Sequence, residues 1–159
     1  MRNNKMLIRA ATAEDAAEIC TVLRCSITEL CVADHQNNPR ILNPWLANKT
    51  EDNLRAWIAR EGQIYCVAEI AGRIAGVAAV SAIDGVLLNY VSPDHQYRGV
   101  SKALMAVSEG WLKEQGQVVS RLTSTATAKQ FYEKLGYLPE GDAKTGRSGM
   151  PSFPMSKAL

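Results

Sequence analysis

Short apolar runs, each bounded by glycine, proline or polar residues, recur along the chain and predict a sheet at its centre. Ala71-Gly72 and Asp84-Gly85 each separate two of these runs and are typical of tight turns between antiparallel strands. The expected strands cover residues 6–9, 64–70, 74–82, 86–91, 118–123, 138–140 and 153–159. We therefore expect a mixed, mostly antiparallel sheet of about seven strands.

Four longer segments show helical spacing of their apolar residues. Thr12 and Thr50 are suitable N-caps for the first two, and Gly116 and Gly136 are suitable C-terminal stops for the last two. The expected helices cover about residues 13–30, 51–61, 99–115 and 125–135. This order predicts an α/β (α+β) fold in which four helices in total cover the two faces of the sheet.

Two stretches do not fit a regular element. Residues 31–49 are rich in turn-forming residues, and Pro44 is expected to block a helix there. Residues 141–152 are rich in glycine, serine and lysine, which predicts a mobile loop. We expect no linker or repeat, so residues 1–159 should form one domain.

Composition and net charge limit the kinds of partner that this chain is expected to bind. Apolar residues make up 47% and charged residues 21% of the 159 positions, as in ordinary globular proteins. The formal net charge of +2 is too small to indicate nucleic acid or an acidic membrane as a partner. No apolar run approaches the length needed to cross a bilayer, so a cytoplasmic location is expected.

The cysteines and histidines do not form a metal-binding pattern. The four cysteines contain no C-x-x-C pair, and the two histidines lie far apart in the sequence. A structural zinc site is therefore not expected, and no metal is assigned. Reduced, mostly buried cysteines are favoured over a nucleophilic cysteine, because no histidine lies nearby in an obvious role.

Residues 89–105 pass from an apolar strand through a short loop into a helix, a geometry that favours anions. The first turn of a helix has backbone N–H groups without partners, and the helix dipole adds positive charge there. Gly99 would allow the backbone to approach a ligand closely, and Arg98 and Lys102 add positive charge. We interpret this segment as a diphosphate cradle.

Two common phosphate-binding motifs do not match this cradle. A nucleoside-triphosphate P-loop requires a second glycine and a Lys-Ser/Thr pair, and a dinucleotide fingerprint requires three glycines. Residues 96–101 instead resemble the acyl-CoA signature of the GNAT superfamily of N-acetyltransferases, Gln/Arg-x-x-Gly-x-Gly/Ala. They read Gln96-Tyr97-Arg98-Gly99-Val100-Ser101, so that serine stands where glycine or alanine is usual.

Two further stretches carry the same resemblance. Residues 128–137, AKQFYEKLGY, are similar to the family helix Ala-x-x-Phe-Tyr-x-Lys-x-Gly-Phe/Tyr. Residues 155–159, MSKAL, resemble the Met-x-Lys-x-Leu ending of many members. The resemblance implies the GNAT fold, with acetyl-CoA as acetyl donor and a small-molecule or peptide amine as acceptor. It also suggests a homodimer, by analogy with other members.

The resemblance assigns donor-binding roles along the chain. The backbone of Tyr90 and Val91 should pair with the pantetheine arm, and the N–H groups of residues 96–101 should hold the diphosphate. Thr125 stands where many members have an asparagine that touches the donor. Lys129 and Phe131 should lie along the pantetheine and adenine. The resulting set of donor-binding residues is Tyr90, Val91, Gln96, Tyr97, Arg98, Gly99, Val100, Ser101, Lys102, Thr125, Lys129 and Phe131.

Tyr132 is the residue that the resemblance assigns to the chemistry. In the family this tyrosine points at the CoA sulfur, and its hydroxyl can protonate the leaving thiolate after direct attack by a neutral amine. Helical spacing alone favours Tyr132 as a core aromatic residue beside Phe131.

The proton acceptor is not fixed by the sequence. Many members use a glutamate on the strand before the cradle, where this chain has Leu87, Leu88 and Asn89. Asp84 is more typical of a turn residue, and a water chain or an already neutral amine would require no side-chain base. Glu69, Glu29, Asp34 and His35 are further candidate bases. The candidates for acceptor binding are Glu29, Asp34 and His35.

These departures from the family pattern leave a second hypothesis open. The missing strand glutamate, Ser101 and Thr125 are also compatible with a non-catalytic CoA-binding module that regulates or binds a partner. Acetyl-CoA binding without CoA release in the presence of amines would distinguish this module from an enzyme.

Overall fold

The computed structural model describes residues 5–146 and 148–159. Within these residues the chain forms eight strands, six α-helices and two short 3-10 helices, η1 (Ala13–Asp15) and η2 (Pro93–His95). The strands are β1 (Met6–Ala10), β2 (Gln63–Ile70), β3 (Arg73–Ser81), β4 (Gly85–Val91), β5 (Val119–Ser124), β6 (Leu138–Pro139), β7 (Lys144–Thr145) and β8 (Pro151–Ala158). The α-helices are α1 (Ala16–Leu30), α2 (Val32–His35), α3 (Pro39–Ala47), α4 (Glu51–Ala59), α5 (Val100–Glu114) and α6 (Lys129–Lys134).

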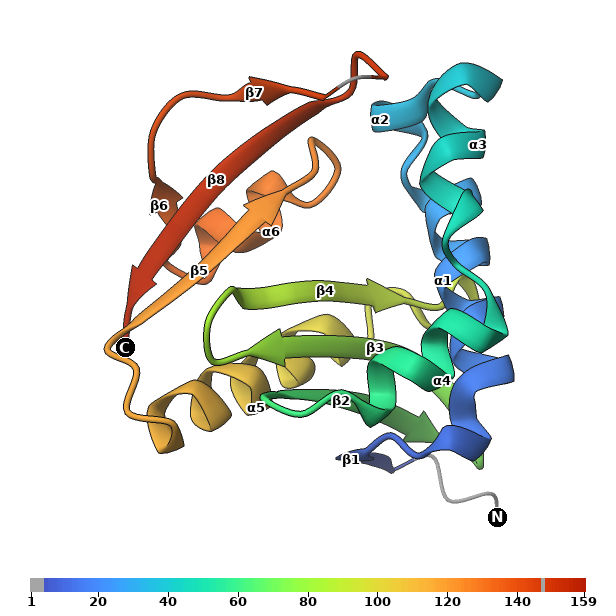
Figure 1. Ribbon diagram of the computed structural model, residues 1–159, viewed down its shortest axis with the longest axis vertical. Coiled ribbons are helices and arrows are strands. Elements are labelled where there is room, and N and C mark those ends of the chain that lie inside the picture. The colour runs from blue at the N-terminus through green and yellow to red at the C-terminus, as the bar shows by residue number, and fades with distance from the viewer. Residues whose placement is uncertain (1–4, 147) are drawn as a thin grey trace.

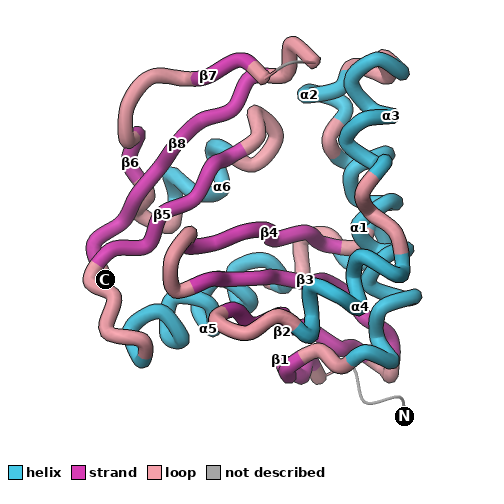
Figure 2. The backbone as a smooth tube through the Cα atoms, in the orientation of Figure 1, coloured by secondary structure: helices cyan, strands magenta, loops and turns pink. Residues whose placement is uncertain are grey.

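The strands form two antiparallel sheets. Strands β1 to β4 lie side by side in chain order, and β8 lies between β5 and β6, with β7 paired to its beginning (Figure 2). All seven predicted strands are present, with ends that differ by at most two residues, so the expected α/β fold is confirmed. Strand β7 is an addition, because it falls in the stretch that was expected to be a mobile loop.

Helices cover both faces of the first sheet. On one face, α1 and α4 pack against β2 and β3 through a core that includes Leu23, Leu54 and Val67. On the other face, α5 packs through Val100 and Leu104. The central strands carry apolar side chains on both faces. Packing against the helices removes these side chains from water, which stabilises the layered arrangement.

The stretch between the first two predicted helices differs from expectation, because it contains α2 and α3. Pro44 lies inside α3 and does not prevent the helix. The Asn38 side chain caps α3 by accepting a hydrogen bond from the Arg40 N–H at 3.0 Å, and Arg24 donates from α1 to the Leu46 carbonyl at 2.8 Å. The cap and this anchor favour the helix, although proline cannot make one of its hydrogen bonds.

Strands β4 and β5 run alongside each other at one end and then diverge (Figure 1). At the close end, Gly85 has a φ of +81°, and a Cβ built there would lie 2.3 Å from the Arg121 carbonyl oxygen. Glycine is therefore required at this position for both conformation and space. Beyond this point the two sheets separate, which places a gap between β4 and β5.

No helix in the described part of the chain has the length and apolar character to span a membrane.

Replacing Gly85 by alanine should strongly destabilise the protein. The added Cβ would occupy the space of the Arg121 carbonyl in a left-handed conformation, and we expect a loss of at least about 2 kcal/mol in the free energy of unfolding. Gly110→Ala is the matched control, because a Cβ there meets nothing within 4 Å inside α5. The control should gain roughly 0.5–1 kcal/mol. Urea unfolding of both variants checks this, and equal effects would contradict it.

Candidate functional site

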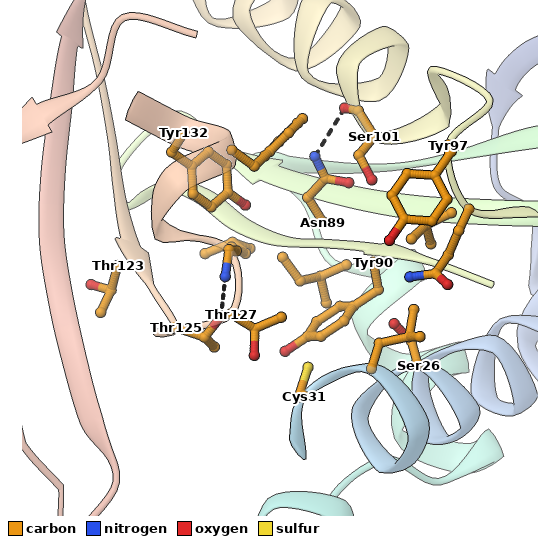
Figure 3. Close-up of a pocket in the computed structure, with 17 residues that line it drawn as sticks. Ser26, Cys31, Asn89, Tyr90, Tyr97, Ser101, Thr123, Thr125, Thr127 and Tyr132 are labelled. Atoms are coloured by element: carbon orange, nitrogen blue, oxygen red, sulfur yellow. Dashed lines mark hydrogen bonds between the residues drawn. The ribbon is translucent and has the colours of Figure 1, made fainter. Parts of the chain in front are cut away.

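A cavity of about 450 Å³ lies between the diverging strands β4 and β5 (Figure 3). The C-terminal end of α1, the beginning of α5 and one face of α6 complete its walls. The lining residues are hydroxyl-bearing, amide, apolar or thiol-bearing, and none of the described ones carries a formal charge. The cavity is therefore a mostly neutral cleft bounded by two strands and three helices.

The cavity brings together most of the residues that the sequence assigned to donor binding and chemistry. Those that line it are Tyr90, Val91, Gln96, Tyr97, Ser101, Thr125, Phe131 and Tyr132. Those outside its lining are Arg98, Gly99, Val100, Lys102 and Lys129. Of this second group, Arg98, Gly99 and Lys102 are exposed near the start of α5, whereas Val100 is buried beneath it.

The loop before α5 has a left-handed backbone at two residues and leads into an uncapped helix. Tyr97 and Gly99 have φ angles of 61° and 76°, and no side chain caps α5. The first turn of α5 contains no acidic residue, so its N–H groups and dipole face outward without an anionic partner from that turn. A Cβ on Gly99 would meet nothing within 4 Å, so the backbone conformation, rather than crowding within the chain, favours glycine here.

Tyr132 extends from α6 into the cavity (Figure 3). Only 6% of the residue is exposed, and its ring packs edge-on against Phe131 and Tyr137 at centroid distances of 5.2 and 5.7 Å. Burial raises the pKa of the Tyr132 hydroxyl above its usual value. The phenol therefore stays protonated at neutral pH and is available as a proton donor.

Thr125 and Lys129 flank the beginning of α6. The Thr125 hydroxyl accepts a hydrogen bond from the Ala128 N–H at 3.2 Å, which fixes the turn into the helix. The Lys129 ammonium lies 4.8 Å from the centre of the Phe153 ring and 3.8 Å from a Glu133 carboxylate oxygen. Lys129 thus faces β8 rather than the main cavity.

Asp34, a candidate for acceptor binding, connects the two sides of the cleft. Asp34 is only 3% exposed, and its carboxylate accepts hydrogen bonds from the N–H groups of Ala126 at 2.7 Å and Thr127 at 3.1 Å. The Thr127 hydroxyl donates to it as well. Asp34 therefore anchors the loop between β5 and α6 to α2, and it does not line the cavity.

His35 and Glu29 also lie outside the main cavity. His35 is fully buried: its Nε2 faces the Ile27 carbonyl at 2.9 Å, and its Nδ1 accepts from the Asn37 N–H at 3.0 Å. This arrangement assigns the proton to Nε2 and uses both ring nitrogens within the chain. Glu29 is exposed and lines a separate cavity of about 220 Å³ between α1 and η2.

The remaining base candidates lie elsewhere. Glu69 lies on β2, where its carboxylate accepts a hydrogen bond from the Arg9 side chain at 3.0 Å. Asp84 is exposed in the turn before β4. In the described residues no cluster of three or more histidine, cysteine, aspartate or glutamate side chains could hold a metal ion.

Cys31 also lines the cavity, and no motif in the sequence indicates this position. It is 5% exposed, and burial, followed by the charge of Asp34, raises the pKa of its thiol to about 12. A thiol with this pKa is protonated at neutral pH and is a poor nucleophile. All four cysteines are free, in keeping with the reduced state expected from the sequence.

Asn89 is a second lining residue without an assigned role. Its side-chain amide donates to the Ser101 backbone carbonyl at 3.1 Å, whereas its Oδ1 is buried without a hydrogen-bond partner in the described structure. Only the alternation of residues along β4, which turns Asn89 and Tyr90 to opposite faces, could have indicated its position from the sequence.

Comparison with known proteins identifies the family. The family profile described as "Acetyltransferase (GNAT) domain" matches residues 33–159. The chain therefore belongs to the GNAT acetyltransferase family, and the fold implied by the sequence motifs is confirmed. A search of curated proteins found no significant match.

Solved structures of low sequence identity share the fold. A GCN5-related N-acetyltransferase from Rhodopseudomonas palustris is 23% identical over 100% of this chain and 99% of its own, with a TM-score of 0.86. The PaiA N-acetyltransferase from Thermoplasma acidophilum, in complex with coenzyme A, is 21% identical over 98% and 99%, with a TM-score of 0.82. YncA, a putative acetyltransferase from Salmonella typhimurium with acetyl-CoA, is 22% identical over 98% and 95%, with a TM-score of 0.72.

Replacing Asp34 by alanine should loosen the loop between β5 and α6. The variant leaves the N–H groups of Ala126 and Thr127 without their acceptor, and we expect a loss of about 1–3 kcal/mol in unfolding free energy. Amide hydrogen exchange should speed up at these two residues first. Asp142→Ala, which removes an exposed aspartate, should stay within about 0.5 kcal/mol of the parent. Unchanged exchange in the Asp34 variant would argue against this anchoring role.

Proposed function

We propose that this chain transfers the acetyl group of acetyl-CoA to a primary amine by direct attack in a ternary complex. The observation that carries the proposal is the buried Tyr132 hydroxyl facing a cavity that extends to the uncapped beginning of α5. A protonated phenol and an uncapped helix start thus face one cleft, which supports binding of an acyl-CoA thioester.

The chain offers matching groups for each part of the donor. The diphosphate fits the N–H groups of residues 96–101, with Arg98 and Lys102 exposed beside them to balance its charge. The edge of β4 at Tyr90 and Val91 faces the cleft and is not paired with β5, so its backbone groups are free to bind the pantetheine arm. Bound in this way, acetyl-CoA supplies an activated thioester.

Tyr132 acts as the general acid in this proposal. The amine nitrogen forms a bond to the thioester carbonyl carbon and loses its extra proton to water. As the bond from this carbon to sulfur breaks, the Tyr132 hydroxyl gives its proton to the leaving thiolate. The phenolate then regains a proton from solvent. The raised pKa of Tyr132 keeps the hydroxyl protonated before each turnover and returns it to that form afterwards.

The neutral lining of the cavity bears on the acceptor. None of the described lining side chains is a carboxylate or an imidazole that could take a proton from an ammonium group. We therefore propose that the acceptor enters as the free amine. At pH 7.5 an α-amino group is roughly a few hundred times richer in the neutral form than a lysine side chain, which favours acceptors of low pKa.

The same neutral lining is also the observation in favour of a second candidate function. A cleft whose described lining has no carboxylate or imidazole is compatible with a module that binds CoA and does not catalyse transfer. Such a module would bind acetyl-CoA and release no CoA with any amine.

Replacing Tyr132 by phenylalanine should lower kcat by about 100-fold, because general acid catalysis typically contributes at least this much. The affinity for acetyl-CoA, measured by calorimetric titration with ATP and NAD as comparators, should change little. Tyr137→Phe is the matched control: its hydroxyl bonds Ser120 at 2.7 Å and Glu109 at 3.0 Å, away from the cavity lining. Unchanged turnover in the Tyr132 variant, when chemistry limits the rate, would remove this residue from the mechanism.

The pH dependence should follow the acceptor rather than the enzyme. We expect kcat/KM to rise with pH and to level off at the pKa of each amine, when amines of different pKa are compared. The raised pKa of Tyr132 keeps the acid protonated to higher pH, so no alkaline decline is expected below about pH 10. The rate of CoA release measures this.

Two results of the amine series would contradict the scheme. A rise that levels off at one fixed pH for all amines would require a base on the enzyme. Acetyl-CoA binding without CoA release for every amine would favour the non-catalytic module.

A further inference from the structure

Asn89, which lines the cleft, has one buried side-chain hydrogen-bond acceptor without a partner in the described part of the chain. Its Oδ1 is one of two buried side-chain oxygen or nitrogen atoms that have no partner in the described part of the chain; the other is His95 Nδ1. Of these two residues, only Asn89 lines the cavity between β4 and β5. A buried polar atom without a partner is costly, and it indicates a group that is supplied from outside the chain.

The other half of the amide fixes the direction of this oxygen. Asn89 Nδ2 donates to the Ser101 carbonyl oxygen at 3.1 Å. Rotating the amide by half a turn would set Oδ1 against that carbonyl oxygen and would break the bond, because both atoms are acceptors. The amide is therefore held with Oδ1 turned away from the Ser101 carbonyl, and only an N–H or O–H donor can satisfy it.

The position of Asn89 indicates which donor this is. In the view of Figure 3, Asn89 falls between Tyr132 on one side and Ser101 and Tyr97 on the other, and all four line the cavity. In the proposed function the thioester lies at Tyr132 and the diphosphate lies at the loop that ends at Ser101. The part of the donor between them is the pantetheine arm, whose amides carry N–H groups, whereas the thioester and the diphosphate carry none.

We propose that Asn89 Oδ1 accepts a hydrogen bond from an amide N–H of the pantetheine arm. Asn89 is then a binding residue that positions the arm between the acid and the cradle. This inference rests on the proposed function. It adds a side-chain contact on the α5 side of β4, where Val91 packs against the core that contains Val100 and Leu104.

The test compares two ligands on the same variant. Asn89→Leu keeps a side chain of similar volume and removes the acceptor. Calorimetric titration with CoA should show a roughly tenfold loss of affinity, the size expected for one buried hydrogen bond left unmade. Adenosine 3′,5′-bisphosphate, which contains the nucleotide end of CoA and lacks the arm, should bind the variant and the parent equally.

A second variant and a stability measurement keep the test decisive. Asn89→Ala should show the same selective loss for CoA, even if leucine is too bulky for the site. Thermal unfolding establishes that each variant is folded before the titrations. Equal weakening of both ligands would assign Asn89 to the shape of the cradle and overturn the inference, as would unchanged affinity for both. If the parent protein binds no CoA, the proposed function itself fails, and the inference fails with it.

Discussion

The close approach of β4 to β5 at Gly85 is the constraint on which the cleft depends. Because a left-handed glycine lets the start of β4 lie against the Arg121 carbonyl, the two sheets are joined at one end and open toward the other. The opening leaves one edge of β4 free of strand pairing, with α5 beginning beside it and α6 on the opposite wall. Backbone groups, a helix N-terminus and a buried phenol thus face one space, which is the arrangement that the proposed acetyl transfer requires.

The parts of the fold that could be read from the sequence are those set by local rules. Tight turns, strand-length apolar runs and the passage from strand to helix around Gly99 each depend on a few neighbouring residues. The ends of all seven expected strands therefore lie within two residues of those in the structure. The two helices between residues 31 and 49 were missed for the opposite reason. Pro44 gave a local signal against a helix, and the contact that anchors α3, from Arg24 to Leu46, joins residues far apart in the sequence.

The site shows the same limit more strongly. Short motifs assigned Tyr132, Gln96, Tyr97 and Ser101 to the site, and all four line the cavity. Asp34 and His35 are polar residues in a turn-rich stretch, which reads as solvated or ligand-binding. The partners of Asp34, such as Thr127, are supplied by a tertiary contact, whereas His35 bonds residues close to it in the sequence, Ile27 and Asn37. Asn89 was passed over because an oxygen without a partner is a property of the folded chain alone.

The placement of β8 has a consequence for how the molecule is assembled during synthesis. The first sheet is built from β1 to β4 in chain order, so each strand can pair with the one made just before it. In the second sheet, β5 and β6 both pair with β8, which is made after them. On the ribosome, the cradle and the edge of β4 can therefore form while β5 still lacks its partner strand, and the opposite wall of the cleft is completed only when β8 has left the exit tunnel.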